Sequence, residues 1–346
     1  MGRPALKSGL MPLWRDRETV QIGVDPRRAI ALSGLGKAAA VLSLLDGARD
    51  TDEVITAAQT YGITREATAG VLGLLTQAGV LQDYPARLHR ALPDYLRARL
   101  APEMACAAIA YGLDDGGAGV MEKRRSAYVR VHGGGRVGAC VATLLAASGV
   151  ARVTCADDGV ASPGDVSLAG AGEADVGASR AAGVAAAIGR VASDVRTRDD
   201  GLIPDLAVLT STGPPDEELL RALLLNRIPH LAARAAEAIG VVGPLVLPGR
   251  SACLRCVELT RAAADPAWPK ILAQSGPASP EACDTVLAAA TAALAAAQAL
   301  AFIDGAAGEP AAANGTLELA LPHWQWKRRT WTAQLACTCG AADNRQ

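Results

Sequence analysis

Aromatic residues are scarce in this sequence, and so is any excess of charge of one sign. Only 3% of the 346 residues are aromatic, with a single Phe, although 50% are apolar overall. The core must therefore be built from Ala, Val and Leu. A net charge of −1 gives no long-range attraction to nucleic acid or to acidic membranes. The length is sufficient for two or three domains, each with its own core.

The sequence also lacks a secretory signal pattern, because charged residues and prolines interrupt Met1–Trp14 before any long apolar run. We therefore expect a cytoplasmic protein without a membrane span. Thr285–Ile303 is long enough to cross a bilayer, but it is dominated by Ala, which partitions weakly into hydrocarbon. We expect it to be a helix buried between domains or subunits. Without a secretory signal, the eight cysteines predict thiols or metal ligands instead of disulfides.

The most informative stretch runs from Tyr128 to Asp158. Alternating Val and polar residues lead into Gly133, Gly135 and Gly138, which have the spacing G-x-G-x-x-G. An apolar helix pattern and a second strand pattern follow. A glycine turn between a strand and a helix lets backbone N–H groups approach a phosphate at the helix N-terminus. Asp158, which closes the second strand, is a candidate partner for a ribose hydroxyl.

The first 86 residues predict a small α+β domain that resembles a winged helix. Two short strands flank Asp25-Pro26, and three helix patterns follow at 35–45, 52–61 and 65–78. Residues 1–84 contain nine Lys or Arg and nine Asp or Glu, so composition gives no basic face for DNA. We expect instead that an extended peptide adds a strand to the edge at 19–24.

Alternating strand and helix patterns after residue 124 predict an open, mostly parallel sheet with helices on both faces, the Rossmann-like α/β class. The expected organisation is an N-terminal arm at 1–17, the winged-helix-like domain at 18–86, connecting helices at 87–123 and the Rossmann-like domain at 124–346. Patterns at 315–321 and 329–335 predict closing antiparallel strands. The basic run Lys123-Arg124-Arg125 is interpreted as a solvated entry to the first strand.

Two close cysteine pairs lie far apart in the sequence. Cys253 and Cys256 form C-x-x-C, and Cys337 and Cys339 form C-x-C. Two short loops that each supply two thiolates are what a tetrahedral structural zinc site needs, and four unrelated core cysteines are the alternative. Cys283 lies just before the long Ala-rich helix, where a nucleophilic thiol is conceivable, but no base stands near it in sequence.

Taken together, the glycine turn, Asp158, DVGASRAAGVAAAI, GPLVLPGRSACLRC and the late cysteine pair resemble the ThiF/MoeB adenylyltransferases, relatives of ubiquitin-activating enzymes, over roughly residues 124–340. The N-terminal region resembles the PqqD-like peptide-recognition domain. That pairing is the arrangement of leader-peptide-binding proteins that present a precursor peptide to a YcaO-family cyclodehydratase. The resemblance implies a homodimer and, in active members, ATP and Mg²⁺ used to adenylate a C-terminal carboxylate.

Several family positions are changed in this chain. Asp158 matches the second carboxylate of an Asp-x-Asp motif, but Ala156 replaces the first; the next loop has no Arg, and Thr212 replaces the metal-binding Asp. Arg180 stands where the family has Lys, which keeps the charge but changes its geometry. The remaining nucleotide-binding candidates are as follows: Gly133, Gly135, Arg136, Gly138, Asp158 and Arg180. We therefore expect ATP-dependent adenylation to be lost or weakened.

The sequence thus favours a non-catalytic or weakly catalytic scaffold that binds a leader peptide and docks a partner enzyme. The alternative is an adenylyltransferase that uses Asp158, Arg180 and Arg136. A nicotinamide oxidoreductase would use the glycine turn, but it gives the paired cysteines no role. A winged-helix regulator would need DNA binding, which the balanced charge of the N-terminal region does not favour.

Overall fold

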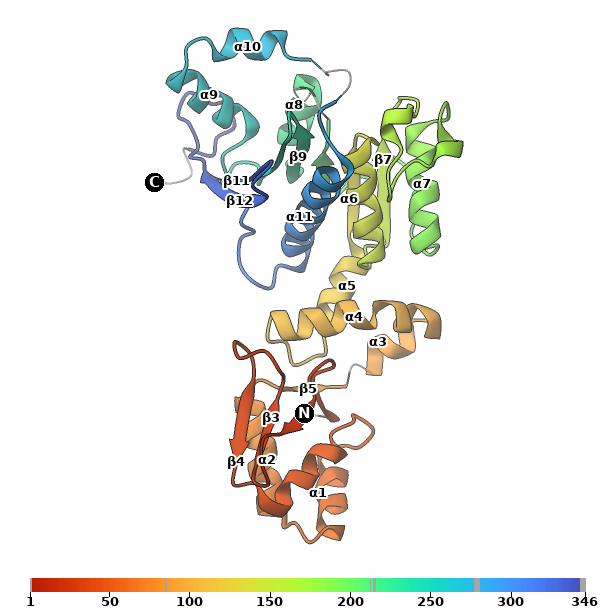
Figure 1. Ribbon diagram of the computed structural model, residues 1–346, viewed down its shortest axis with the longest axis vertical. Helices are drawn as coiled ribbons and strands as arrows, with labels where there is room; N and C mark the ends of the chain where they lie inside the picture. The colour runs from red at the N-terminus through yellow and green to blue at the C-terminus, as the bar shows by residue number, and fades with distance from the viewer. Residues whose placement is uncertain (1, 85, 212, 214–215, 277–280, 343–346) are drawn as a thin grey trace. The chain divides into compact units, whose positions relative to one another are not determined.

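The computed structural model describes residues 2–84, 86–211, 213, 216–276 and 281–342. The chain divides into two compact units, Met1–Glu122 and Lys123–Gln346. Figure 1 shows the elements of both. Each unit is described by itself below.

The first unit contains two small antiparallel sheets. Strands β2 (Pro12–Trp14), β3 (Thr19–Ile22) and β4 (Ile30–Ser33) form one sheet in the order β2-β3-β4, and β1 (Pro4–Leu6) pairs with β5 (Leu81–Asp83). Both β1 and β2 lie within residues 1–17, the segment predicted to be an N-terminal arm. Pro4 and Pro12 begin these two strands, and a proline weakens the strand signal of a sequence. An edge strand nevertheless tolerates proline at its first residue.

The position of β3 corrects a second expectation. Residues 19–24 were expected to supply a free edge, but β3 pairs with β2 through Pro12↔Ile22 and with β4 through Ile22↔Ile30. It is the inner strand, with both edges occupied. The outer edges of this sheet belong to β2 and β4.

The expected helices follow the sheet. They are the 3₁₀ helix η1 (Gly36–Leu44), α1 (Thr51–Thr60) and α2 (Arg65–Gln77). The first of these is tighter than the expected α-helix. Asp50 and Glu53 form a capping box at α1, and the Thr64 side chain accepts a hydrogen bond from the N–H of Ala67 at α2.

Three further helices connect the sheet region to the second unit: α3 (Ala86–Ala91), α4 (Asp94–Ala110) and α5 (Ala118–Ser126). The expected break at Pro93 separates α3 from α4. Pro93 precedes the first residue of α4, where it removes no intrahelical hydrogen bond.

The second unit is built on a seven-stranded sheet in the order β12-β11-β10-β9-β8-β6-β7. Its parallel part consists of β7 (Arg152–Ala156), β6 (Tyr128–His132), β8 (Leu206–Leu209) and β9 (His230–Ala236). The antiparallel part adds β10 (Ile239–Val246), β11 (Gly315–Ala320) and β12 (Gln325–Thr330). The prediction of a mostly parallel Rossmann-like sheet is confirmed.

The second closing strand is the exception. It was expected at 329–335 but runs over Gln325–Thr330, because Ala320 pairs directly with Gln325 across a short turn.

Helices of the second unit cover this sheet (Figure 1). The α-helices are α6 (Arg136–Ala147), α7 (Arg180–Val191), α8 (Glu217–Leu225), α9 (Leu254–Ala264), α10 (Trp268–Gln274) and α11 (Thr285–Asp304). Two short 3₁₀ helices, η2 (Pro163–Asp165) and η3 (Glu173–Asp175), lie between β7 and α7.

Helix α11 is the Ala-rich helix of the sequence, and it is long and apolar enough to cross a membrane. It packs against α6, β9 and β10 inside its own unit. A Cβ at Gly240 of β10 would overlap the Thr291 hydroxyl, so a glycine there permits the close approach of helix and strand. The helix is therefore a core element of the second unit, where a location between domains or subunits was expected.

The interpretation of Lys123-Arg124-Arg125 as a solvated run also fails at its central residue. The Arg124 guanidinium donates to both carboxylate oxygens of Asp304, at 2.8 and 2.7 Å, and to the Ser148 carbonyl at 3.1 Å. The Arg124 side chain is 7% exposed and that of Asp304 is 0% exposed. Such a desolvated pair is stable only with bidentate geometry, which this pair has.

Candidate functional sites

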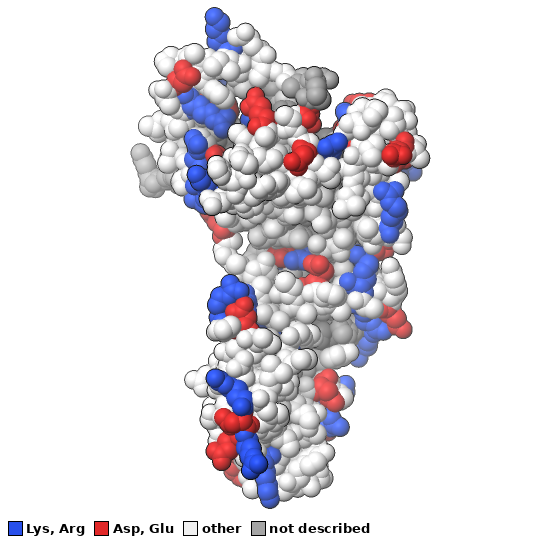
Figure 2. Space-filling view, viewed as in Figure 1, with Lys and Arg blue, Asp and Glu red and all other residues white. Residues whose placement is uncertain are grey.

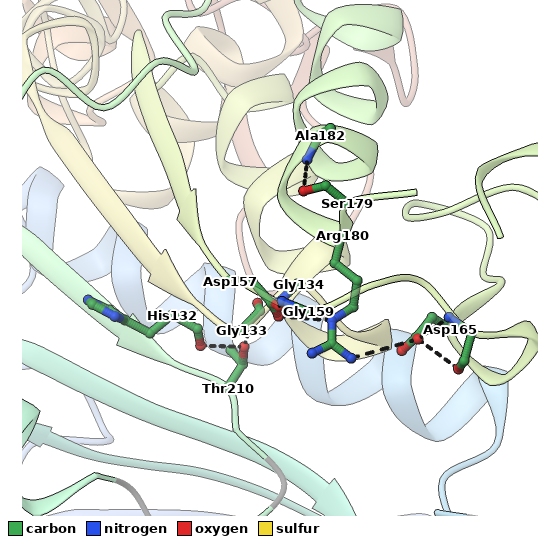
Figure 3. A network of polar contacts seen from close by, with 11 residues as sticks. His132, Gly133, Gly134, Asp157, Gly159, Asp165, Ser179, Arg180, Ala182 and Thr210 are labelled. Carbon is green, nitrogen blue, oxygen red and sulfur yellow. Dashed lines mark hydrogen bonds and ion pairs between the residues drawn. The ribbon is translucent and has the colours of Figure 1, made fainter. Parts of the chain in front are cut away.

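The glycine turn lies at the carboxyl end of β6, next to the end of β8. In an open sheet ligands bind at such a point, because the strand order reverses here: the chain passes from β6 to β7 on one side, and then from β7 to β8 on the other side of β6. Thr210, just after β8, donates from its hydroxyl to the carbonyls of His132 and Gly133, at 2.9 and 3.0 Å. The turn is therefore tied to the neighbouring strand (Figure 3).

The three motif glycines have different physical roles. Gly133 has φ of +103°, which side chains rarely adopt. A Cβ at Gly138 would overlap the Gly133 carbonyl and the Thr210 hydroxyl, so this glycine permits close packing of α6 on β6. A Cβ at Gly135 would meet only Asp165, in ordinary contact at 3.7 Å. Gly133 and Gly138 are thus required by packing alone, and only Gly135 has room in front of it.

Asp157 occupies the centre of the crevice. Its carboxylate accepts hydrogen bonds from the N–H groups of Gly134 at 2.6 Å and Gly159 at 2.7 Å. The Asp157 side chain is only 7% exposed. One of the turn N–H groups that would face a phosphate is therefore already bonded to a carboxylate of the chain itself.

Arg180 completes this network from the first turn of α7 (Figure 3). Its Nε lies 3.0 and 3.1 Å from the two oxygens of Asp157, and its Nη1 lies 3.8 Å from Asp165. The candidate phosphate-binding cation is thus paired with one carboxylate and lies near a second. The position of the Arg180 guanidinium also explains why residue 159 is a glycine, because a Cβ there would overlap it.

The pKa of Asp157 reflects the same contacts. Burial would raise it, but the N–H groups of Gly134 and Gly159 and the guanidinium of Arg180 outweigh burial and hold the pKa below the usual value. Asp157 is therefore an anion that stabilises the fold at neutral pH.

Sequence reasoning chose Asp158 and missed Asp157. Asp158 is exposed, whereas Asp157 is the first residue after β7 and its side chain turns back toward the glycine turn. The signal was present in the sequence as two adjacent aspartates at a strand end. Because neighbouring side chains point in different directions, only the end point of β7 decides which one faces the turn.

Arg136, the third charged candidate, is bound to the backbone. Its guanidinium donates to the carbonyls of Gly164 at 2.5 Å and Cys283 at 2.9 Å. It therefore links the loop after β7 to the segment before α11. Thr212, at the position of the family's metal-binding Asp, lies outside the described residues, and Asp216 caps α8 by accepting from the N–H of Glu218.

The four paired cysteines do come together. Cys253 and Cys256 flank the start of α9, and Cys337 and Cys339 follow β12 by a few residues. The Sγ–Sγ distances are 3.8 Å for Cys253–Cys256, 3.5 Å for Cys253–Cys337 and 3.6 Å for Cys256–Cys339. All four sulfurs lie within 4.8 Å of one another. A tetrahedral zinc with bonds of about 2.3 Å requires sulfurs about 3.8 Å apart, so the set fits this metal.

The four cysteines differ in acidity, and Cys256 is the most acidic of those with a shifted pKa. The Cys256 sulfur accepts from the Cys253 thiol and from the N–H of Gln334, which lower its pKa to about 4. Burial and the same bond raise the pKa of Cys253, and burial raises that of Cys337 to about 11. A bound cation would draw the remaining protons off, because metal ligands must be thiolates.

Cys283 lacks the surroundings of a nucleophile. It is buried, its thiol donates to the Asp284 carbonyl at 3.7 Å, and burial raises its pKa to about 11. Asp284, not Cys283, caps α11. A cavity of about 370 Å³ adjoins Cys283, with Glu281 and Asp284 on its wall, and these carboxylates also oppose thiolate formation.

Comparison with known proteins gives a consistent result. Residues 108–202 match the ThiF family. The matched segment contains the glycine turn, Asp157 and Arg180. No curated protein matches the sequence.

Solved structures match this chain over almost its whole length. The structure of E. coli MccB with MccA-N7isoASN has a TM-score of 0.71 at 16% identity, and covers 98% of this chain and 99% of that one. The E. coli MccB structure with ATP has a TM-score of 0.70 at 17% identity, with 97% and 99% covered. A crystal structure of PaaA has a TM-score of 0.68 at 15% identity, with 94% and 99% covered. At these identities the likeness establishes the fold.

Proposed function

We propose that this protein is a ThiF-like scaffold that binds a precursor peptide and presents it to a partner modifying enzyme, such as a YcaO-family cyclodehydratase. One observation carries the non-catalytic part of the proposal. The Gly134 N–H and the Arg180 guanidinium, which a nucleotide phosphate would need, are both bonded to Asp157. ATP would have to displace a partly buried ion pair before it could bind.

The peptide would bind to residues 18–86, the PqqD-like part of the first unit. Strand addition requires an edge with open backbone groups, and β3 has none because it is the inner strand. Pro12 removes an N–H from β2, which weakens that edge as a template. The proposed peptide-binding strand is therefore β4 (Ile30–Ser33), in place of the 19–24 edge.

Binding of the peptide encoded beside the gene tests this choice of strand. Proline is placed at Ala31 and Leu32 of β4 in turn, because neighbouring residues direct their N–H groups to opposite edges. One of the two changes should abolish binding with the thermal unfolding midpoint retained. Trp14→Pro in β2, whose N–H faces away from β3, is the matched control and should leave affinity unchanged. Loss of binding with Trp14→Pro alone would move the site to β2.

Adenylation is the alternative function, and it would use ATP and Mg²⁺ to activate a peptide carboxylate. It is favoured by the full-length likeness to MccB, which has been solved with ATP and with MccA peptides. ATP–pyrophosphate exchange with the purified protein and its peptide separates the two functions. The scaffold predicts no exchange above background. Exchange that disappears with Arg180→Ala would establish adenylation.

We also propose that the cysteine cluster holds a structural zinc, and that the protein works as a cytoplasmic homodimer. The cluster supports the first of these through its donor set and spacing. The zinc would tie α9 to the segment after β12, since the two cysteine pairs come from these elements. Measured zinc content and sedimentation of the full chain test the metal and the dimer respectively.

A further inference from the structure

Tryptophan and arginine concentrate in one part of the second unit. The whole chain has five Trp, and four of them, Trp268, Trp324, Trp326 and Trp331, lie in α10 or in and around β12. Arg261 lies over the rings of Trp268 and Trp331, at 5.0 and 5.6 Å, and Arg329 lies over Trp331 at 5.6 Å. Trp and Arg are the residues most enriched at the energetic centres of protein interfaces.

Strand β12 is an open edge. Among the residues that the structure describes, it pairs with β11 alone, and all six of its residues are exposed. Its other side therefore presents backbone N–H and C=O groups that a further strand can pair with. Trp326, within the strand, is 39% exposed, and Trp324, just before it, is 42% exposed.

Trp324 is also held in an uncommon backbone conformation. Its φ is +53°, in the left-handed region that bulky residues avoid. Strain of this kind is concentrated at functional sites. Here it keeps a large apolar ring at the surface next to the open edge.

The charge on β12 is positive. Lys327 and Arg329 lie on the same face of the strand, because their separation is two residues. Glu318 opposes them on β11, but it is occupied by Arg329 at 3.3 Å and by the Thr316 hydroxyl at 2.9 Å. A hollow of about 190 Å³ opens on this face, lined by Lys327, His323 and the apolar Ile239 among others.

These features distinguish between possible occupants of the edge. A second copy that paired β12 with β12 would bring Lys327, Arg328 and Arg329 of each chain together, and like charges on paired strands repel. A nucleic acid would need more free cations, but Arg328 is bound to the carbonyls of Ala311 and Ala313. On the face drawn in Figure 2, Lys and Arg are interspersed with acidic groups and form no continuous basic stripe.

We propose that β12 is the docking strand for an extended, acidic segment of a partner protein, which adds to the sheet as an eighth strand. Acidic side chains on one face of that segment lie beside Lys327. Apolar side chains on its other face lie beside Trp326. The proposal goes beyond the scaffold role, because it requires no peptide binding by residues 18–86.

The probe is a fluorescein-labelled ten-residue peptide of alternating Glu and Val, with a Lys–Val peptide of equal length for comparison. Fluorescence polarisation with the full chain should show saturable binding of the Glu–Val peptide only. Hydrogen exchange at residues 325–330 should slow when the peptide is bound. Lys327→Glu should weaken binding roughly tenfold, whereas Lys270→Glu, an exposed lysine of α10, should not change it.

Methylating alternate backbone nitrogens of the Glu–Val peptide separates strand addition from simple charge attraction. One of the two alternate-methylated peptides should lose binding, since only one set of N–H groups faces β12. Equal binding of both methylated forms, or no protection at 325–330, would refute the docking strand. Binding of a single-stranded oligonucleotide that Trp326→Ala removes would also refute it, in favour of nucleic acid. Leader-peptide binding at β4 is measured separately, so neither result decides the other.

Discussion

The glycine turn and the cysteine cluster belong to the same domain, and both were predicted from residue spacing, but they differ in what their groups are doing. In the cysteine cluster, four sulfurs point at a common centre and their strongest partners are one another. In the glycine turn, the Gly134 N–H and the nearby Arg180 guanidinium are both bonded to Asp157. Residue spacing predicts which side chains can meet, but it does not reveal which of them already have a hydrogen-bond or ion-pair partner within the chain.

The difference has a physical origin in charge. A buried group of thiols becomes thiolates together only beside a cation, so the proposed zinc would balance the charge of this cluster. The Gly134 N–H and the Arg180 guanidinium favour an anion, and the Asp157 carboxylate supplies one from within the chain. A site whose charge is already balanced gains little from a ligand of the same sign.

The largest expected effect is on the cysteine cluster. Cys256→Ser should abolish stoichiometric zinc and lower the free energy of unfolding by about 3–5 kcal/mol, because the metal joins two distant segments. Zinc content and chemical denaturation measure the two effects. Cys106→Ser, at an exposed cysteine, is the control. If Cys256→Ser contained no zinc and still had the same free energy of unfolding as the purified wild-type protein, a structural zinc would be contradicted.

Next in size is the packing of the glycine turn. Gly138→Ala should destabilise the protein by about 2–3 kcal/mol, since its Cβ overlaps the Gly133 carbonyl and the Thr210 hydroxyl. Gly135→Ala should cost less than about 0.5 kcal/mol, because its Cβ has room. Thermal unfolding of the pair measures both. Equal costs would mean that packing does not explain why the motif has glycine at Gly138.

The Asp157 network should give an effect of about 2 kcal/mol. Asp157→Asn leaves Arg180 without its main partner and should destabilise the protein at neutral pH. Asp158→Asn, at the exposed neighbour, should change stability by less than about 0.5 kcal/mol. Because the folded pKa of Asp157 is depressed, its contribution is complete above the unfolded pKa and is lost as pH falls through the folded value. The gap between wild type and Asp157→Asn should therefore close in acid, which denaturation at several pH values measures.

The remaining prediction concerns the pH dependence set by His132, whose side chain is partly buried at the end of β6. Burial, together with the positive charge of Arg130, lowers its pKa to about 4. The unfolded chain binds this proton near pH 6.5, so stability should decrease as pH falls from about 6.5 to 4 and then level off. His132→Gln should flatten that slope, and His323→Gln, at an exposed histidine, should keep it. An unchanged slope in His132→Gln would show that His132 is protonated in the folded protein.

The sequence predicted the elements whose signals are local. Thr64 and Pro93 lie at the starts of α2 and α4, and such starts are readable from sequence because capping and missing N–H groups act within one turn. The alternation of strand and helix patterns along the chain predicted the parallel sheet, because each pattern is also carried by residues that are close in sequence. The four cysteines were identified because two short spacings restrict the chemistry to few choices.

Relations between distant segments were harder to predict. Arg124 looked like part of a solvated basic run, because its partner Asp304 lies 180 residues away. The strand at 19–24 looked like an edge, because the proline-containing segment at 12–14 gave no strand signal of its own. The end of the second strand placed Asp157 at the turn, and that end is defined by pairing with β6.

By itself, the sequence determined that a glycine turn joins a strand to a helix and that two cysteine pairs are available. The tertiary structure alone decided that the cysteines converge and that the turn is occupied by Asp157 and Arg180. The physical reason is that backbone conformation follows from neighbours in the chain, whereas the pairing of charges depends on which distant side chains the fold brings within reach.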